Sequence, residues 1–230
     1  MRRMVIAIDG PSGAGKSTIA RVLAGRLGYT YIDTGALYRA LGWKAKEKGI
    51  DPSDEAALED LCGSVEVVLS HADGAQRVSV SGRDVTDLIR TPEMGMMASA
   101  VSKSPTGRAR LLSIQRAMGE RGGVVMDGRD IGTVVFPHAE VKFFLDATPE
   151  ERGRRRWKEF RDKGSNVDLD AITDEIRKRD AQDCGRELAP LRKAADAVYV
   201  DSSMMTIDDV VNELIAQVEN KRLQRAKSEV

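Results

Sequence analysis

The sequence predicts an α/β fold in which a central parallel sheet of about five strands is covered by helices on both faces. Three observations lead to this prediction. Short apolar runs alternate with segments of helical periodicity along most of the chain, which is typical of parallel sheets with crossover helices. A glycine-rich segment at residues 10–17 joins the first apolar run to the first helical segment. One β-rich stretch, residues 63–90, interrupts the alternation and is expected to form a small inserted lobe.

The predicted strands are short apolar runs separated by helical pattern. In chain order they are Met4–Asp9, Tyr29–Asp33, Gly123–Met126, Val141–Leu145 and Ala197–Val200. Two further runs, Val65–Leu69 and Arg77–Ser81, are joined by a turn that contains Asp73-Gly74. A turn of this composition between β-rich runs predicts a hairpin within the lobe.

The predicted helices are recognised by apolar residues at helical spacing and by their capping residues. Residues 17–27 carry an apolar stripe and are followed by Gly28, which suits a helix C-terminus. A second helix is expected to end at Gly49, and a third is expected to open at Asp51-Pro52 and to run through Leu61. Further predicted helix starts are Thr91-Pro92, Ser104-Pro105, Thr148–Glu151 and Thr206–Asp209.

These elements suggest a division of the chain into a core, a lobe and a tail. The core is predicted to comprise residues 1–62 and 91–220, with the inserted β-lobe at 63–90 and a charged tail at 221–230 that frays. Within the core, residues from about 149 to 166 are rich in arginine and are predicted to form a lid.

The composition is that of an ordinary globular protein and argues against several function classes. Hydrophobic residues make up 41% of the chain and charged residues 31%. Lys+Arg and Asp+Glu are both 36, and only 4% of residues are aromatic, which argues against a partner that is a nucleic acid or an anionic membrane. The first apolar run is too short for a signal sequence or a membrane span. We therefore expect a cytoplasmic protein with small-molecule substrates. A monomer is expected as well, although no feature of the sequence determines the oligomeric state.

Residues 10–17 match the motif G-x-x-x-x-G-K-[ST] completely, with a predicted strand before it and a helix after it. Glycines let the backbone curl so that several N–H groups point into one concavity, and the helix adds the positive end of its dipole. Lys16 is expected to reach the β- and γ-phosphates of ATP, and the Ser17 hydroxyl to bind Mg²⁺. A glycine-rich turn that merely joins two elements is the alternative. The predicted ATP contacts in this segment are Gly10, Pro11, Ser12, Gly13, Ala14, Gly15, Lys16, Ser17 and Thr18.

Charged residues follow the predicted strands at their carboxyl ends, where ligands bind in open α/β sheets. Asp33–Arg39 follows the second strand, and Asp127–Asp130 follows the third. Guanidinium groups bind phosphate through paired donors, so arginines here indicate an acceptor that already carries a phosphate. Asp127 stands where a carboxylate would organise Mg²⁺ through water.

Two further groups of charged residues have an ordinary structural alternative. Arg179, Asp183 and Arg186 are spaced to share one helix face, but spacing alone favours a solvated ion pair. Residues 151–163 are dense in arginine and lysine and could be a solvated helix face. Beside a phosphate-binding loop they could instead form a mobile lid that closes over the transferring phosphoryl group. Its nearly consecutive arginines are Arg152, Arg154, Arg155 and Arg156.

Several segments, taken in order, resemble those of a known family. They are Ile8–Lys16, Asp33–Arg39, Asp127–Pro137 and Phe144–Ala147. The chain resembles the bacterial cytidylate kinases from Val5 to about Val218, and the insertion at 65–81 is similar to the extra β-lobe of those enzymes. The resemblance implies the three-layer P-loop NTPase fold and transfer of the γ-phosphoryl group of ATP to CMP or dCMP. It also implies Mg²⁺ as cofactor and a place in pyrimidine nucleotide metabolism.

The resemblance further implies roles for individual residues at the acceptor site. Ser99, Arg108 and Asp130 match the positions that read the cytosine edge. An aspartate can accept from the exocyclic amine of cytosine, which uracil lacks. The positions that hold the monophosphate are matched by Arg39, Arg129 and Arg186. Arg179 and Asp183 match positions near the sugar, and Thr34 stands where some members of the family have serine.

The arginines of the lid also match the family, although the sequence does not assign each one to a particular phosphate. We assign Arg152 to ATP, and Arg155 and Arg156 to the transferring phosphoryl group. The predicted catalytic set is Lys16, Asp127, Arg129, Arg155 and Arg156.

Three other functions remain as alternatives. One is another P-loop small-molecule kinase, for UMP, AMP, shikimate or a coenzyme precursor. A second is a regulatory GTPase, which should carry a guanine-reading N-K-x-D segment, whereas the only Asn-Lys here, Asn220-Lys221, is followed by Arg222-Leu223. A third is a nucleic-acid-binding ATPase, which zero net charge and few aromatic residues disfavour.

Overall fold

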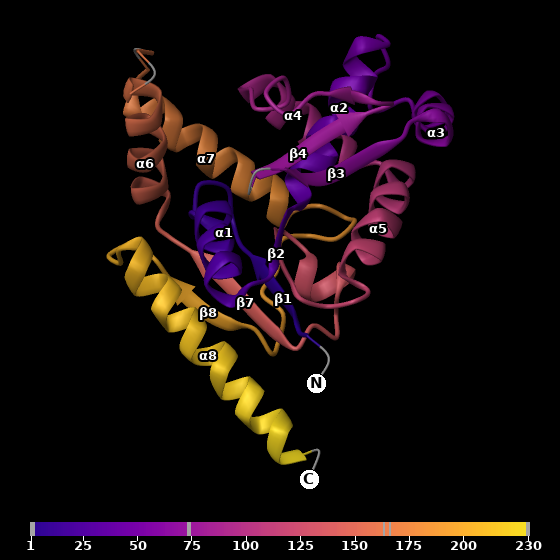
Figure 1. The fold of residues 1–230 in the computed structure, drawn as a ribbon. Helices are drawn as coiled ribbons and strands as arrows, with labels where there is room; N and C mark the ends of the chain where they lie inside the picture. The colour runs from indigo at the N-terminus through magenta and orange to yellow at the C-terminus, as the bar shows by residue number, and fades with distance from the viewer. Residues whose placement is uncertain (1–2, 73–74, 163, 166, 229–230) are drawn as a thin grey trace. The chain divides into compact units, whose positions relative to one another are not determined.

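The computed structural model describes residues 3–72, 75–162, 164–165 and 167–228 (Figure 1). The chain divides into two compact units. The first combines Met1–Tyr31 with Arg121–Val230, and the second is Ile32–Glu120. The second unit is thus larger than the lobe expected at residues 63–90.

The first unit is built on a five-stranded sheet with the strand order β2-β6-β1-β7-β8. The central strand β1 pairs in parallel with β6 and β7, and β7 pairs in parallel with β8. Asp9, the last residue of β1, is in register with Gly128 at the end of β6. The carboxyl ends of the central strands therefore meet at one edge of the sheet. The strands are β1 (Val5–Asp9), β2 (Thr30–Asp33), β6 (Val124–Gly128), β7 (Val141–Asp146) and β8 (Val198–Asp201).

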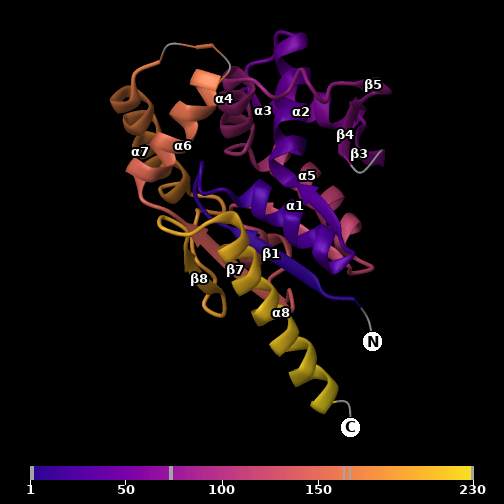
Figure 2. The same cartoon turned by 60° about the vertical axis from the view of Figure 1, so that its left-hand side comes forward.

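Helices flank this sheet, which confirms the predicted fold class. Helices α1 (Lys16–Leu27) and α8 (Ile207–Ser228) contact each other, and their apolar faces join the strands in one core (Figure 2). Helices α6 (Pro149–Asp162) and α7 (Leu169–Cys184) pack together as a pair. Burial of a continuous apolar strand on both faces explains why the predicted strands read as unbroken hydrophobic runs.

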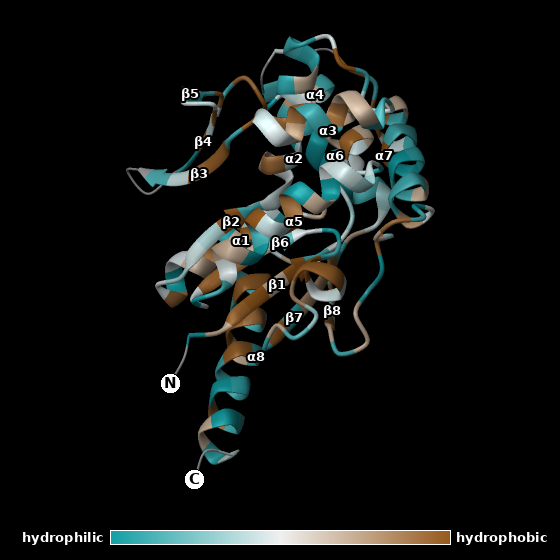
Figure 3. Ribbon diagram, turned by 90° about the vertical axis from the view of Figure 1, so that its right-hand side faces the viewer, coloured by the Kyte–Doolittle hydropathy of each residue, from teal (hydrophilic) through white to brown (hydrophobic). Residues whose placement is uncertain are grey.

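The last helix continues further than the sequence suggested. Residues from 221 were expected to fray, but α8 extends to Ser228. Its C-terminal part is hydrophilic, as the teal ribbon in Figure 3 shows, and polar contacts attach it to the rest of the unit. Arg222 donates to the Tyr29 hydroxyl at 3.2 Å, and Arg225 donates to Glu140 at 3.1 Å.

In its described residues, the second unit combines four helices with a three-stranded antiparallel sheet of order β3-β4-β5. The predicted hairpin is β3 and β4, and the predicted turn at Asp73-Gly74 lies outside the described residues. The third strand was not predicted, because it is only two residues long. The elements are α2 (Thr34–Glu47), α3 (Glu55–Ser64), β3 (Val67–Ala72), β4 (Ala75–Val80), β5 (Arg83–Asp84), α4 (Pro92–Val101) and α5 (Pro105–Gly119).

Most predicted helix starts are confirmed by side-chain caps. Thr91 and Ser104 accept from backbone N–H groups three residues on, as N-cap residues should. The expected start at Asp51-Pro52 is wrong, since α3 begins at Glu55 and its N-cap is Asp54. The Asp51 carboxylate instead accepts from the backbone N–H of Ser53 and closes a turn ahead of the helix. Both aspartates suit a cap, and local sequence did not distinguish them.

Candidate functional site

The loop between β1 and α1 has a backbone that only glycine tolerates at its key positions. Gly13 and Gly15 have φ angles of 79° and 88°, in the left-handed region. At Gly10, an added Cβ would lie 1.9 Å from the carbonyl oxygen of Leu145. The backbone conformation and the close packing of the loop therefore require glycine at these positions of the motif. The loop curls tightly at the carboxyl end of β1 and leads directly into α1.

Lys16 is the first residue of α1 and is buried, with 6% of its surface exposed. Its Nζ donates to the carbonyl oxygen of Pro11 at 2.6 Å, inside the loop. Burial and, after it, the positive charge of Arg129 lower the pKa of Lys16 to about 7, although Asp127 and Asp9 oppose the change. An anionic ligand in the loop would reverse this cost, because it would replace the lost hydration with opposite charge.

A small group of oxygen atoms lies beside this loop. The Ser17 hydroxyl donates to Asp127 Oδ2 at 2.9 Å, and the Tyr31 hydroxyl donates to Asp127 Oδ1, also at 2.9 Å. Asp127 lies on β6 and is 4% exposed. Tyr31 was not predicted as a site residue, because only the fold brings it to Asp127.

This oxygen group fits Mg²⁺. A magnesium ion binds to one or two protein oxygens and completes its shell with water and substrate phosphates. The Ser17 hydroxyl and the Asp127 carboxylate are such oxygens, and they are already in contact. Among the described residues there is no cluster of three or more His, Cys, Asp or Glu that could hold a metal by itself. A metal here would therefore depend on the oxygens of a ligand.

Asp9 connects the phosphate-binding loop to the segment after β6. One turn of π-helix, Ile131–Val135, follows that segment, and Asp9 accepts from the backbone N–H of Ile131 at 2.8 Å and of Gly132 at 2.7 Å. Burial outweighs these two hydrogen bonds, which oppose it, and the pKa of Asp9 is raised to about 7. The sequence reading missed Asp9. The signal was present, since a single carboxylate ends an otherwise apolar strand directly before the loop.

Arg129, Asp183 and Arg186 form a buried ionic cluster. Arg129 Nε donates to Asp183 Oδ2 at 2.9 Å, and Arg186 donates to Asp183 Oδ1. The Asp183 side chain is only 1% exposed, so the alternative of a solvated ion pair is wrong. Helix α7 ends at Cys184, so Arg186 reaches Asp183 from beyond the helix end.

Arg179 adds to the positive charge of this cluster. Its Nε is a buried atom with no hydrogen-bond partner within the described part of the chain. Burial and, after it, the charge of Arg129 lower the pKa of Arg179 to about 10, although Asp183 opposes the change. Three guanidinium groups thus share the single carboxylate of Asp183, a surplus of largely buried positive charge that suits an anionic ligand.

Asp130 lies next to Arg129 and is 6% exposed. Its carbonyl oxygen accepts from the backbone N–H of Val134 at 2.8 Å and of Val135 at 3.1 Å. The turn of π-helix after it therefore holds Asp130 and Arg129 in place at the strand end.

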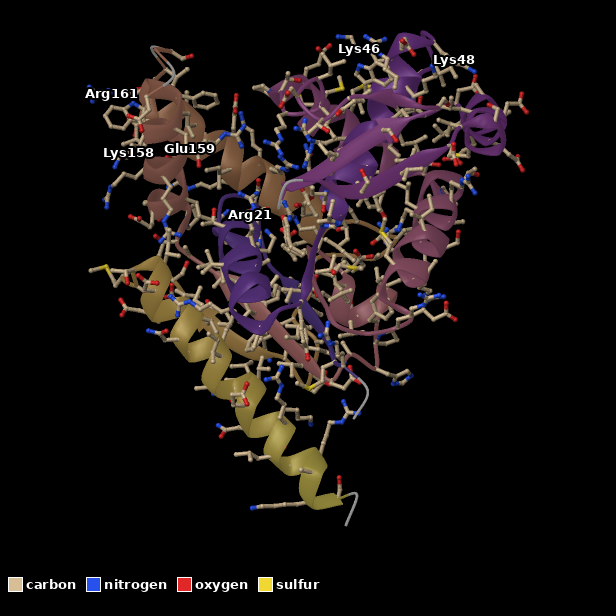
Figure 4. The ribbon with its side chains drawn as sticks, in the orientation of Figure 1. Arg21, Lys46, Lys48, Lys158, Glu159 and Arg161 are labelled. Carbon is tan, nitrogen blue, oxygen red and sulfur yellow. The ribbon has the colours of Figure 1, made fainter. Side chains whose placement is uncertain are left out.

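The arginines of the predicted lid differ from one another in their surroundings. Arg152 is 3% exposed, and its guanidinium bonds to protein groups on three sides. Arg155 donates to the carbonyl oxygen of Ser202 at 2.6 Å, and Arg156 lies over the Phe160 ring at 5.5 Å. Arg154 pairs with Glu151 on the exposed side. The other charges labelled on α6 in Figure 4, which include Lys158, are exposed.

The remaining predicted site residues belong to the second unit. Asp33 caps α2 and accepts from Arg39 at 2.8 Å. The guanidinium of Arg108 lies over the Tyr38 ring, 6.0 Å from its centroid. Thr34 is buried, and the Ser99 hydroxyl is a buried atom for which residues 3–228, as far as they are described, supply no hydrogen-bond partner.

A lysine and a serine that open a helix directly after a glycine loop, with a strand-end carboxylate on the serine, are the arrangement of P-loop nucleotide-binding proteins. A family model described as cytidylate kinase matches residues 6–220. The chain therefore belongs to the cytidylate kinase family, as four of its segments predicted.

Curated relatives agree with this family. The chain is 51% identical to the cytidylate kinase of Syntrophotalea carbinolica, over 96% of this chain and 94% of that protein. It is also 51% identical to the cytidylate kinase of Geobacter sulfurreducens, over 93% of this chain and 91% of that protein.

Solved structures support the fold alone. A gluconokinase from Sinorhizobium meliloti 1021 matches with a TM-score of 0.50 and 17% identity, over 97% of this chain and 98% of that one. An uncharacterized protein from Eubacterium ventriosum matches with a TM-score of 0.51 and 13% identity, over 94% and 99% of the two chains. Of the described helices, none is both long and apolar enough to cross a membrane.

Proposed function

We propose that this protein transfers the γ-phosphoryl group of ATP to CMP, which gives ADP and CDP, and that dCMP is a second acceptor. The surplus of buried positive charge around Asp183 is the observation that carries the proposal. Two polyanions must come within bonding distance in this reaction, and their repulsion has to be neutralised. Membership of the cytidylate kinase family supports CMP as the acceptor.

The donor side of the site is the loop before α1. Its backbone N–H groups and the positive end of α1 would bind the phosphates of ATP, and Lys16 would reach the β- and γ-phosphates. Mg²⁺ would be held by the Ser17 hydroxyl and, through water, by Asp127, and when bound it neutralises charge on the phosphate oxygens. The proposed ATP contacts of the loop are Gly10, Pro11, Ser12, Gly13, Ala14, Gly15, Lys16, Ser17 and Thr18.

The acceptor side is proposed from the family positions. Asp130 would accept from the exocyclic amine of cytosine, and Ser99 and Arg108 would contact the same base edge. The proposed phosphate contacts are Arg39, Arg129 and Arg186, and the proposed sugar contacts are Arg179 and Asp183. The Thr34 hydroxyl completes the set. The ionic cluster supports this reading for the residues of the first unit, because Asp183 already orients Arg129 and Arg186.

The chemistry needs no general base. The nucleophile is an oxygen of the CMP phosphate, which is already anionic at neutral pH. It forms a bond to the γ-phosphorus as the bond from that phosphorus to the β–γ bridging oxygen breaks, and ADP leaves with the electron pair. Catalysis then consists of alignment and charge neutralisation. The groups proposed for it are Lys16, Asp127, Arg129, Arg155 and Arg156. A monomeric state and a cytoplasmic location remain predictions from the sequence.

The testing experiment measures ADP formation from ATP and Mg²⁺ with CMP, dCMP, UMP, AMP and shikimate each offered as acceptor. We expect turnover with CMP and dCMP well above the other acceptors. Lys16→Ala serves as the control and should abolish turnover while its circular dichroism spectrum stays that of the wild type. Binding of ATP without turnover of any acceptor would retain the nucleotide site and refute the CMP assignment.

A further inference from the structure

Among the charged groups described on α6, the helix of the predicted lid, the guanidinium of Arg152 makes the most hydrogen bonds. Its Nε donates to the carbonyl oxygen of Ala147 at 2.8 Å, and its Nη1 donates to the carbonyl oxygen of Ser12 at 3.0 Å. Nη1 and Nη2 also bond to the carboxylate of Asp180, at 3.0 and 2.6 Å. An arginine has five N–H donors, and these four bonds account for four of them.

These partners come from three separate parts of the first unit. Ala147 follows β7, Ser12 lies in the phosphate-binding loop and Asp180 lies on α7. The Arg152 side chain is 3% exposed and that of Asp180 is 21% exposed, so solvent screens this pair weakly. Arg152 therefore joins the loop to both helices of the α6–α7 pair at one buried point.

The packing around Arg152 leaves little freedom at this point. An added Cβ at Gly153 would lie 2.3 Å from the Thr173 hydroxyl oxygen, so α6 approaches α7 very closely. An added Cβ at Gly13 would lie 3.2 Å from the Cβ of Arg152, so the loop packs against the stem of the arginine. Close packing therefore holds the backbone and the aliphatic stem of Arg152, and hydrogen bonds hold its guanidinium.

The bond to Ser12 sets the direction of one N–H group in the phosphate-binding loop. In a trans peptide the C=O of one residue and the N–H of the next point in opposite directions. Arg152 holds the Ser12 carbonyl toward itself, and the N–H of Gly13 is therefore directed the other way. Orienting backbone N–H groups is what makes such a loop bind phosphate.

We propose that Arg152 is a positioning residue that orients the phosphate-binding loop through Ser12, with Asp180 holding its guanidinium in place, and that it is not itself a ligand of ATP. This replaces the direct ATP contact expected for Arg152 from the family resemblance. The inference deepens the proposed function and rests on it only for the identity of the nucleotide. Asp180 contacts no part of the phosphate-binding loop in the described interactions, so it provides the test.

The experiment compares Arg152→Lys, Asp180→Asn and the double variant. Asp174→Asn is the matched control, because Asp174 lies on the same helix in an exposed ion pair with Arg177. The dissociation constant of ATP with Mg²⁺ is measured by calorimetry without acceptor, and the KM values for ATP and CMP are measured in the assay that uses CMP. Melting temperatures are recorded in parallel.

We expect each single variant to weaken ATP binding on the order of tenfold and to raise the KM for ATP without changing that for CMP. The double variant should bind ATP as tightly as whichever single variant has the lower ATP affinity, because both changes remove the same connection. Asp174→Asn should match the wild type. The proposal is overturned if Arg152→Lys weakens ATP binding while Asp180→Asn leaves it unchanged or strengthens it, since a direct ligand would not need Asp180. A lower melting temperature with unchanged ATP affinity would also overturn it.

A crystal structure of the unmodified protein with Mg²⁺ and a non-hydrolysable ATP analogue tests the same point if a variant fails to fold. Arg152 bonded to Ser12 and Asp180 would support the proposal, and Arg152 bonded to a phosphate would refute it. Absence of CMP turnover in the wild type would count against the proposed function alone. ATP binding by the variants would still decide the role of Arg152.

Discussion

Helix α7 carries two ionic groups of similar design in opposite surroundings. In the first, Asp183 is bonded by Arg129 and Arg186, and its side chain is 1% exposed. In the second, Arg177 is bonded to Asp174 and Glu150, and its side chain is 51% exposed. Each group has one central charge shared by two opposite charges. The buried group carries a surplus of positive charge, and the exposed group a surplus of negative charge.

The two ionic groups differ in how strongly solvent screens them. Exposed ion pairs are screened by water and salt and contribute little. Hydrogen bonds to Glu150 and Asp174 raise the pKa of Arg177, whereas burial lowers the pKa of Arg179, two residues further along the same helix. Guanidinium groups held where burial disfavours their charge are candidates for binding an anion. Both groups contain an aspartate and an arginine three residues apart in the sequence, Asp174 and Arg177 in one and Asp183 and Arg186 in the other. The two groups therefore differ in burial and not in sequence spacing.

Of the substitutions considered, Asp183→Asn should lower the free energy of unfolding the most. It leaves two buried guanidinium groups without a carboxylate, and we expect the free energy of unfolding to fall by about 3–5 kcal/mol. Urea denaturation at pH 7 measures this fall, and the KM for CMP should rise in the same variant. A loss below that of an exposed pair would mean that the cluster is not the buried ionic centre inferred from its 1% exposure.

Asp130→Ala asks whether a second buried carboxylate of this region serves the ligand. If Asp130 accepts from the amine of cytosine, its removal should weaken the binding of CMP by about 1–3 kcal/mol. The binding of UMP, which lacks that amine, should weaken by much less. Dissociation constants for both nucleotides give the ratio directly. Equal losses for CMP and UMP would show that Asp130 supports the fold of the site without reading the base.

Asp9→Asn tests a buried carboxylate that has backbone N–H partners in place of arginines. The pKa of Asp9 is raised from 3.8 to about 7, so the native state holds its proton more tightly than the unfolded chain. This contribution to stability is present below pH 4 and is lost as pH rises toward 7, with a slope of at most about 1.4 kcal/mol per pH unit. Asparagine does not titrate, so the variant should show a flatter dependence of unfolding free energy on pH. If the variant showed the same dependence of unfolding free energy on pH as the wild type, Asp9 would not be the group that titrates.

The sequence was informative where the chemistry is local and uninformative where the fold creates it. The glycine loop and the caps at Thr91 and Ser104 depend on neighbouring residues, and they were predicted. The sequence marks Asp9 as a carboxylate at the end of an apolar strand, but it does not show that its partner is Ile131, 122 residues away. The burial of Asp183 was likewise invisible, because a helix face has the same spacing whether it meets solvent or protein.

Arg177→Gln should have the smallest effect of the series. It removes both bonds to Asp174 and Glu150, yet all three side chains are more than half exposed. We expect the free energy of unfolding to stay close to that of the wild type, and any difference to shrink in high salt, because added ions screen these exposed pairs further. The KM for CMP should not move. If Arg177→Gln instead cost as much as Asp183→Asn, exposure would not be what separates the two ionic groups of α7, and the surplus charge around Asp183 would lose its argument for a ligand.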